Sequence, residues 1–236
     1  MKNSKLQIGF GSIMIAFLLL SCDSGIVGNG DVTTRTEKIS DFNRLEIQGN
    51  FNVFLDQTGK SGLRIEADEN LMDIIEVNES GNKLEIRSEV NILRARKKNI
   101  YIQFDELKRL ELFGALEVRS DGKLRFKSLD ITGGGAADVN LDLEADWLSI
   151  DMSGAGDFDL TGEVAQVDLR VSGAGGFDLI DLKTEKMFID ISGVAHARVY
   201  ATEELRVEIA GAGAVRYKGD PEVSRNVSGI GSLKKY

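Results

Sequence analysis

The sequence predicts an all-β protein, a single-stranded parallel β-helix (β-solenoid) with coils of about 19 residues. A short motif recurs through the C-terminal half at nearly constant spacing: an apolar residue, Ser or Thr, Gly, and a second small residue. On both sides of each motif, apolar and polar residues alternate with the two-residue period of a half-buried strand. Because such strands cannot bury their apolar sides alone, we expect successive repeats to stack on one another.

The N-terminus has the features of an export signal. Lys2 and Lys5 precede an apolar stretch at residues 8–20. This stretch is shorter than the roughly 20 residues that cross a bilayer, which favours removal over retention as an anchor. Residues 19–22, Leu-Leu-Ser-Cys, resemble a lipobox. We therefore expect residues 1–21 to be a lipoprotein signal peptide and Cys22 to be the site of lipid attachment.

The composition excludes several classes of protein. Cys22 is the only cysteine, so a chain acylated there has no disulfide, thiolate metal site or cysteine nucleophile. The formal net charge is −9, and it becomes about −11 when Lys2 and Lys5 are removed with the signal. Charge alone therefore makes the chain a poor binder of nucleic acid or anionic lipid. We expect the lipid to hold the protein at the membrane, through a flexible Gly-rich tether at residues 22–30.

Residues 31–236 contain no evident linker, and we expect them to form a single β-solenoid domain. Residues 31–110 are strand-like but less regular, which predicts irregular first coils or a cap, whereas residues 111–236 carry the regular repeats. Within the first part, helical turns are expected only at residues 69–76 and 89–97. Alternation predicts strands at residues 42–49, 62–67, 83–87 and 99–104.

The repeats can be aligned on the first glycine of each motif. These glycines are Gly133, Gly154, Gly173, Gly193, Gly211 and Gly229, with a degenerate earlier copy at Gly114, and the steps between them are 19, 21, 19, 20, 18 and 18 residues. The positions two and four residues before the glycine, and four and six after it, are apolar in nearly every copy. We expect these positions to form the interior, and the glycines to allow positive φ and close approach of adjacent coils.

The position five residues after the glycine is charged in every copy. It is occupied by Asp138, Asp159, Asp178, Arg198, Arg216 and Lys234. Stacked in register, the three carboxylates would form a candidate Ca²⁺ site, because calcium favours clustered carboxylate oxygens. Three single carboxylates do not complete such a shell, so the favoured interpretation is a solvated face with no metal, in which Asp178 and Arg198 form an ion pair.

The sequence predicts no catalytic residues and no cofactor. His196 is the only histidine and is expected in a turn. Without a second histidine or a free cysteine, the chain has too few residues for a zinc site or a Ser-His-Asp triad. The serines of the motif are better explained as caps of backbone groups. Phe158 and Phe177 are expected in the core, and no stacking platform for sugar rings is evident.

The repeats and the N-terminus together resemble a known family. The lipobox, the opening Phe-Asn-Arg-Leu-Glu-Ile at residues 42–47, and the Ser-Gly-Ala-Gly-x-Phe-Asp-Leu repeats at 153–160 and 172–179 are similar to the "putative auto-transporter adhesin, head GIN domain" family. Members are mostly secreted proteins or lipoproteins of Bacteroidota. The resemblance implies a right-handed parallel β-helix and an adhesion role, and it implies no set of catalytic residues.

These features predict a noncatalytic cell-envelope lipoprotein, an adhesin-like or binding module that presents a β-helix surface to a protein or glycan partner. The outer membrane, on its surface or periplasmic face, is favoured over the inner membrane. One alternative is a polysaccharide-active enzyme of the lyase type, with the junction of Asp178 and Arg198 as its nearest candidate site. The other is a periplasmic scaffold or sensor.

Overall fold

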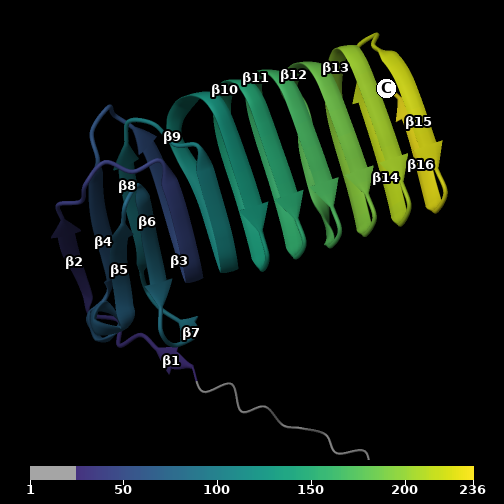
Figure 1. Ribbon diagram of the computed structural model, residues 1–236. Helices are drawn as coiled ribbons and strands as arrows, with labels where there is room; N and C mark the ends of the chain where they lie inside the picture. The colour runs from purple at the N-terminus through teal and green to yellow at the C-terminus, as the bar shows by residue number, and fades with distance from the viewer. Residues whose placement is uncertain (1–24) are drawn as a thin grey trace, which may run out of the picture.

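The structure is a computed structural model that describes residues 25–236, so the predicted signal peptide and Cys22 lie outside the described residues. The chain is 77% strand and 3% helix, and its stacked parallel coils of about 19 residues make about six turns. The predicted β-solenoid is thereby confirmed. Figure 1 shows the coils following one another along a single axis, from the N-terminal strands to the C-terminal strands.

Each regular coil consists of two arms that enclose the core between them. The arm after the glycine turn belongs to face A, exemplified by residues 155–161, and the arm before the next turn belongs to face B, exemplified by residues 166–171. The long strands bend from one face to the other without interruption (Figure 1). They are β9 (Arg109–Gly133), β10 (Ala136–Met152), β11 (Ala155–Val171), β12 (Ala174–Ile191) and β13 (Val194–Ile209), followed by the shorter β14 (Ala212–Lys218), β15 (Glu222–Val227) and β16 (Ile230–Lys235).

The inward positions form the core that the alternation predicts. Phe158 and Phe177 lie side by side inside adjacent coils, with ring centroids 5.3 Å apart and both side chains buried. On the opposite arm, Val171 and Ile191 are buried in the same way. Burying such apolar side chains contributes roughly 1.5–3 kcal/mol each, and adjacent coils share this contribution because each stacks on the next.

The first copy of the motif is aligned differently from the sequence prediction. Strand pairing places Gly135, not Gly133, in the column of turn glycines, because Ala136 pairs with Ala155 and Ala115. Gly133 lies opposite Met152 in the core, where its missing side chain makes room for the Met152 sulfur. The cause is the coil between Gly114 and Gly135, which has two extra residues in the bend near residues 120–123. Insertions in a bend leave the pairing of both faces intact.

The glycine column is explained by the close approach of neighbouring turns. In each turn the residue after the glycine donates its N–H to the carbonyl of the glycine one coil earlier, as Ala174 does to Gly154 at 3.0 Å. A Cβ on Gly173 would lie 1.8 Å from that same carbonyl oxygen. In this column only Gly114 and Gly49, which pairs with it, have a positive φ, of 109° and 144°. Close approach is therefore the general reason for glycine here, and positive φ is not.

An antiparallel cap closes the N-terminal end of the solenoid. On face A, β2 (Val32–Glu37), β4 (Gly62–Asp68) and β8 (Lys98–Phe104) extend the sheet beyond β3 (Arg44–Gln57). On face B, β5 (Ile75–Ser80) and β6 (Lys83–Ser88) form a hairpin beside β3. The 3₁₀ helix η1 (Glu69–Ile74) connects the two faces and buries Leu71 and Met72 over the end of the core.

Two expectations about this region were wrong. Residues 89–97 form no helical turn and instead contain β7 (Ile92–Arg94). Residues 26–30, expected in a mobile tether, are bonded to the cap: β1 (Ile26–Val27) pairs with β7, and the Gly30 N–H donates to Asp68 at 3.0 Å. No helix within residues 25–236 is long and apolar enough to cross a membrane.

Asp68 holds the cap together through its carboxylate. The residue is fully buried, and it accepts hydrogen bonds from the backbone N–H groups of Gly30, Arg96 and Lys97 at 2.9–3.1 Å. Burial by itself raises the pKa of this carboxyl, but the three N–H donors outweigh burial and hold the pKa below its usual value. The ionised form is therefore favoured in the folded protein.

Replacing Asp68 by asparagine should lower the free energy of unfolding at pH 7 by about 2 kcal/mol, the scale of hydrogen bonds to a charged group. Because the folded pKa is depressed, the contribution of Asp68 is complete above its unfolded pKa of about 4 and is lost as pH falls below that value. Urea unfolding of wild type and D68N should therefore differ most at pH 7, and the difference should shrink progressively as pH falls below about 4. The exposed Asp73, changed to asparagine, is the control; a D68N deficit independent of pH would contradict the assignment.

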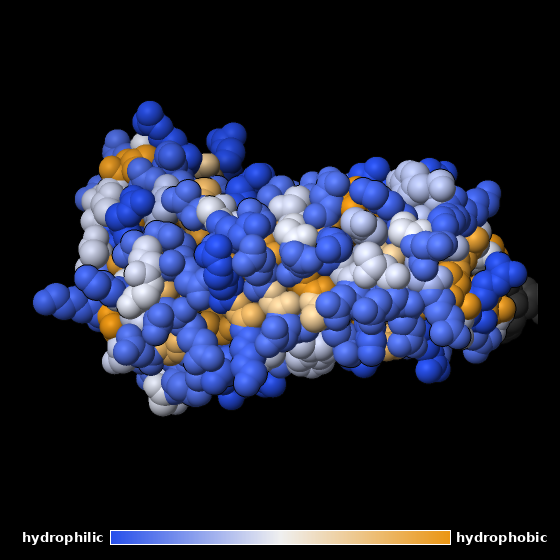
Figure 2. All heavy atoms as spheres, turned by 90° about the horizontal axis from the view of Figure 1, so that it is seen from above, coloured by the Kyte–Doolittle hydropathy of each residue, from blue (hydrophilic) through white to orange (hydrophobic). Residues whose placement is uncertain are grey.

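The C-terminal end of the solenoid exposes hydrophobic residues to solvent. Seen from above, most of the visible surface is hydrophilic, and hydrophobic residues are exposed at the C-terminal end on the right (Figure 2). There Ile230 is 84% exposed and Val227 is 37% exposed. Two inward positions of this last coil carry cations: Arg225 stacks on Val207, and Lys235 stacks on Tyr217.

Candidate binding surface on face A

The charged ladder on face A runs through different residues from those predicted. Asp138 pairs with Asp157, and Asp159 pairs with Asn140, so the three predicted carboxylates are not in one row. The two-residue offset of the first repeat causes this error. The row that contains Asp159, here called the central row, reads Thr36, Arg64, Tyr101, Phe54, Arg119, Asn140, Asp159, Asp178, Arg198, Arg216 and Lys234.

An acidic hollow of about 310 Å³ lies over Gly176, which has no side chain to fill the space between Asp157 and His196. Asp157 accepts the Gly176 N–H at 3.0 Å. Asp138, Asp159 and Asp178 also line the hollow. His196 belongs to β13 and is exposed on face A, so its predicted place in a turn was wrong.

The chemistry of this hollow is limited by its ion pairing. Arg198 forms the predicted ion pair with Asp178, which occupies the one arginine of the hollow. Among residues 25–236, no group of three His, Cys, Asp or Glu side chains has the geometry to hold a metal ion. Two of the motif serines bond to backbone carbonyls as expected, Ser153 to Gly133 and Ser192 to Val171.

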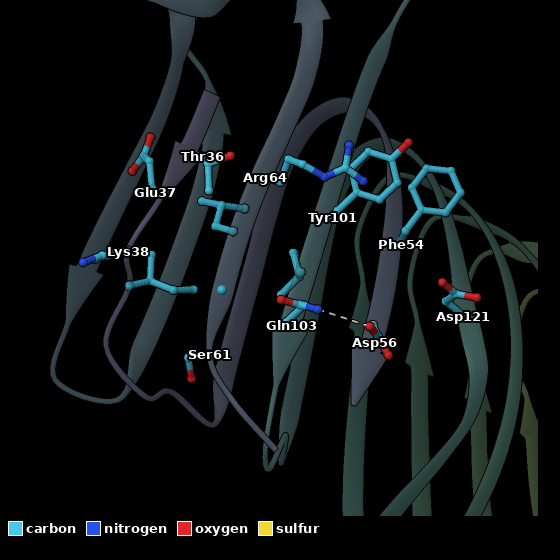
Figure 3. Close-up of a pocket in the computed structure, with 14 residues that line it drawn as sticks. Thr36, Glu37, Lys38, Phe54, Asp56, Ser61, Arg64, Tyr101, Gln103 and Asp121 are labelled. Atoms are coloured by element: carbon cyan, nitrogen blue, oxygen red, sulfur yellow. Dashed lines mark hydrogen bonds between the residues drawn. The ribbon is translucent and has the colours of Figure 1, made fainter. Parts of the chain in front are cut away.

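The central row contains an aromatic pair that sequence reasoning missed. Phe54 and Tyr101 stack on the outside of face A, with centroids 4.8 Å apart and rings 15° from parallel. The Arg64 guanidinium carbon lies 3.6 Å from the centroid of the Tyr101 ring (Figure 3). The signal was present, because both aromatic residues occupy the polar phase of alternating strands, Val-Phe-Leu and Ile-Tyr-Ile. Only the pairing of β3 with β8 brings them together.

A cavity of about 620 Å³ lies beside this stack, in the size range of small-molecule sites. Its floor contains Gly62, and Ile39 adds apolar surface. Figure 3 shows Arg64 beside Tyr101 on the side of β4, and Asp56 and Asp121 on the side of β3 and β9, while Glu37 and Lys38 both lie on the side of β2. This arrangement suits a ligand with an anionic group at one end and hydrogen-bond donors at the other.

Comparison with known sequences identifies the family. A sequence model described as "Putative auto-transporter adhesin, head GIN domain" matches residues 41–221, which includes most of the cap and the repeats. The chain belongs to this family. The resemblance seen in the repeat motif is thereby confirmed, and no curated protein matches the chain.

Solved structures similar to this head GIN domain chain come from related bacteria. A putative adhesin of Bacteroides fragilis is 26% identical with a TM-score of 0.83, and the match covers 90% of this chain and 100% of that one. A putative lipid binding protein of Parabacteroides distasonis is 26% identical with a TM-score of 0.71, covering 89% and 99%. A putative adhesin of the same organism is 20% identical with a TM-score of 0.72, covering 90% and 100%, and shows the shared fold. These names place the family with cell-envelope or surface-associated proteins.

Proposed function

We propose that this chain is a noncatalytic envelope lipoprotein, held at the outer membrane by an acylated Cys22, which binds a glycan or protein partner through face A. The observation that carries the proposal is the Phe54–Tyr101 stack on an outward position of a solvated face. Neither ring is fully buried, so the pair is not needed to fill the core. Exposed aromatic residues beside a cavity are typical of binding sites. The adhesin names of the family and of the similar structures support the same role.

The proposal is tested by retention of whole cells and of the purified domain on mucin-coated surfaces. The F54S/Y101S variant should lose most of the retention, because the substitutions remove the aromatic surface while leaving the inward residues unchanged. The matched control is Phe188→Ser, which alters an outward, half-buried aromatic residue on face B. Equal retention of both variants and wild type would contradict a role for face A.

Lipid attachment and exposure need a separate measurement. Protease shaving of intact cells should remove the domain if it lies on the cell surface, and a Cys22→Ser variant should be released from the membrane fraction. Protection of the domain in cells whose envelope is intact would instead support a periplasmic scaffold or sensor.

A second candidate function is a polysaccharide lyase that uses the acidic hollow. The observation in its favour is that several carboxylates and Arg198 do meet there. Its weakness is that Arg198 is already paired with Asp178, so the hollow offers no unpaired arginine or lysine to stabilise a developing negative charge. Appearance of unsaturated ends on an acidic polysaccharide incubated with the wild-type protein, and not with D157N, would establish this function.

A further inference from the structure

We propose that the cavity beside Tyr101 binds an acidic saccharide, with its carboxylate on Arg64 and its hydroxyl groups on Asp56 and Gln103. This inference rests on the proposed binding role of face A and names the class of ligand. The cavity is the one of about 620 Å³ described above, between β2, β4, β8 and β3.

Arg64 is oriented but not neutralised. Its guanidinium carbon lies over the Tyr101 ring, 3.6 Å from the centroid, and no carboxylate within residues 25–236 forms an ion pair with it. The nearest acid of β2, Glu37, is paired with Arg35 at 2.8 Å. A planar guanidinium held against a ring keeps its N–H donors in a fixed fork, the geometry that binds a carboxylate through two hydrogen bonds.

The platform below Arg64 is rigid before any ligand arrives. The Tyr101 hydroxyl accepts a hydrogen bond from Asn99 at 3.1 Å and donates one to Glu66 at 3.2 Å. The other face of the ring packs on Phe54. Because these contacts fix the ring, Arg64 loses little side-chain freedom on binding, and this preorganisation favours affinity.

The opposite side of the cavity suits hydroxyl groups. Gln103 donates to Asp56 at 3.4 Å, so the pair presents both donors and acceptors, and Asp121 adds a further acceptor. Vicinal hydroxyls of a sugar donate and accept at once and match such a mixed pair. Gly62 beside Gln103 leaves the floor open, and the half-buried Ile39 offers apolar surface to the C–H groups of a ring.

A saccharide fits this surface better than a lipid bilayer or an acyl chain. Charged and polar side chains make up much of the cavity lining, and the neighbouring row of face A carries Glu117, Asp138 and Asp157. These acids would repel an anionic membrane laid against the face. A polyhydroxylated ligand needs contact only within the cavity.

The test uses trigalacturonate and its fully methyl-esterified form as probes, titrated into the soluble domain by calorimetry. Wild type should bind trigalacturonate with a dissociation constant below about 1 mM, and esterification should weaken binding about tenfold or more because it removes the charge that Arg64 recognises. Arg64→Gln should cause a similar loss. The control Arg170→Gln, an exposed cation on face B that makes no ion pair in the described chain, should leave binding unchanged.

A second variant separates a cavity from a lone surface charge. Gly62→Val keeps Arg64 but fills the floor, where a Cβ already comes within 3.1 Å of the Gln103 amide oxygen, and it should abolish binding. Unchanged affinity in R64Q or G62V, or no binding to wild type, would overturn the inference. Vesicles of anionic phospholipid that bind through Arg64 while trigalacturonate does not would also overturn it. Retention on mucin that depends on Phe54 and Tyr101, without trigalacturonate binding, would leave the proposed function standing and remove only this ligand.

Discussion

Replacing Gly173 by alanine should lower the free energy of unfolding by about 3 kcal/mol, at the upper end of overpacking effects. The new Cβ would lie 1.8 Å from the Gly154 carbonyl oxygen and 2.7 Å from the Ser153 carbonyl oxygen. Both atoms are backbone, so no side chain can rotate away. Relief requires the two turns to separate, which weakens the 3.0 Å hydrogen bond from Ala174 to Gly154. Because each coil is stabilised by its neighbours, the damage extends to the interface between β11 and β12.

The matched control for this prediction is Gly213→Ala, two residues after the glycine of its own turn. Its Cβ would come no closer than 3.3 Å to any atom, and the nearest atoms belong to Ile191 and Ile209. Alanine already occupies the equivalent position as Ala137 and Ala195. Urea unfolding followed by circular dichroism should show a large loss for G173A and less than about 1 kcal/mol for G213A. Equal losses would mean that close contact between turns does not distinguish Gly173 from the other glycines of the repeats.

Replacing both Arg225 and Lys235 by valine should make the protein associate through its C-terminal end. By strand alternation these two cations occupy inward positions of the last coil, where the preceding coil has Val207 and Tyr217; both remain exposed, and Lys235 pairs with Asp220 at 2.9 Å. Charges that point inward at a sheet edge are a known protection against pairing with another strand. With valine, the last coil would present two open strand edges above a continuous apolar surface that includes Val223, Val227 and Leu233.

We expect dimers rather than fibres from this variant. The N-terminal end offers no matching surface, because Arg35 on β2 points inward and donates to the carbonyls of Met72 and Ile75 at 2.8 Å. Two C-terminal ends can therefore meet only each other, which closes the assembly. Light scattering after size exclusion should give twice the wild-type mass for R225V/K235V. The control R216V/K234V removes the same charge from outward positions and should keep the wild-type mass; a dimer of the control would show that charge alone, and not inward placement, prevents association.

The core could be predicted from the sequence because alternation is a local property. Whether Phe158, Phe177 or Ile191 points inward depends only on the phase of its own strand, and all three are buried. The ion pair of Asp178 with Arg198 was predicted as well, because the turns at Gly173 and Gly193 are aligned in the structure as they are in the motif, and each charged residue lies five positions after its glycine. The predicted alignment of Asp138 with Asp159 was wrong because the preceding coil has two extra residues near position 121. They lie in a bend, and the alternation of apolar and polar residues does not reveal an insertion there.

The binding surface depends on contacts that no local pattern contains. By itself, the sequence determined the repeat, the inward columns and the polarity of the outer faces, since each follows from the two-residue period of a strand and from turns that need glycine. Only the tertiary structure decided that β8 lies beside β3, that Arg64 lies over Tyr101, and that Asp138 lies beside Asp157. Changing the neighbours of an outward residue changes the free energy of folding little, so the sequence pattern does not specify those neighbours. The packing of the cap and the length of each bend specify them.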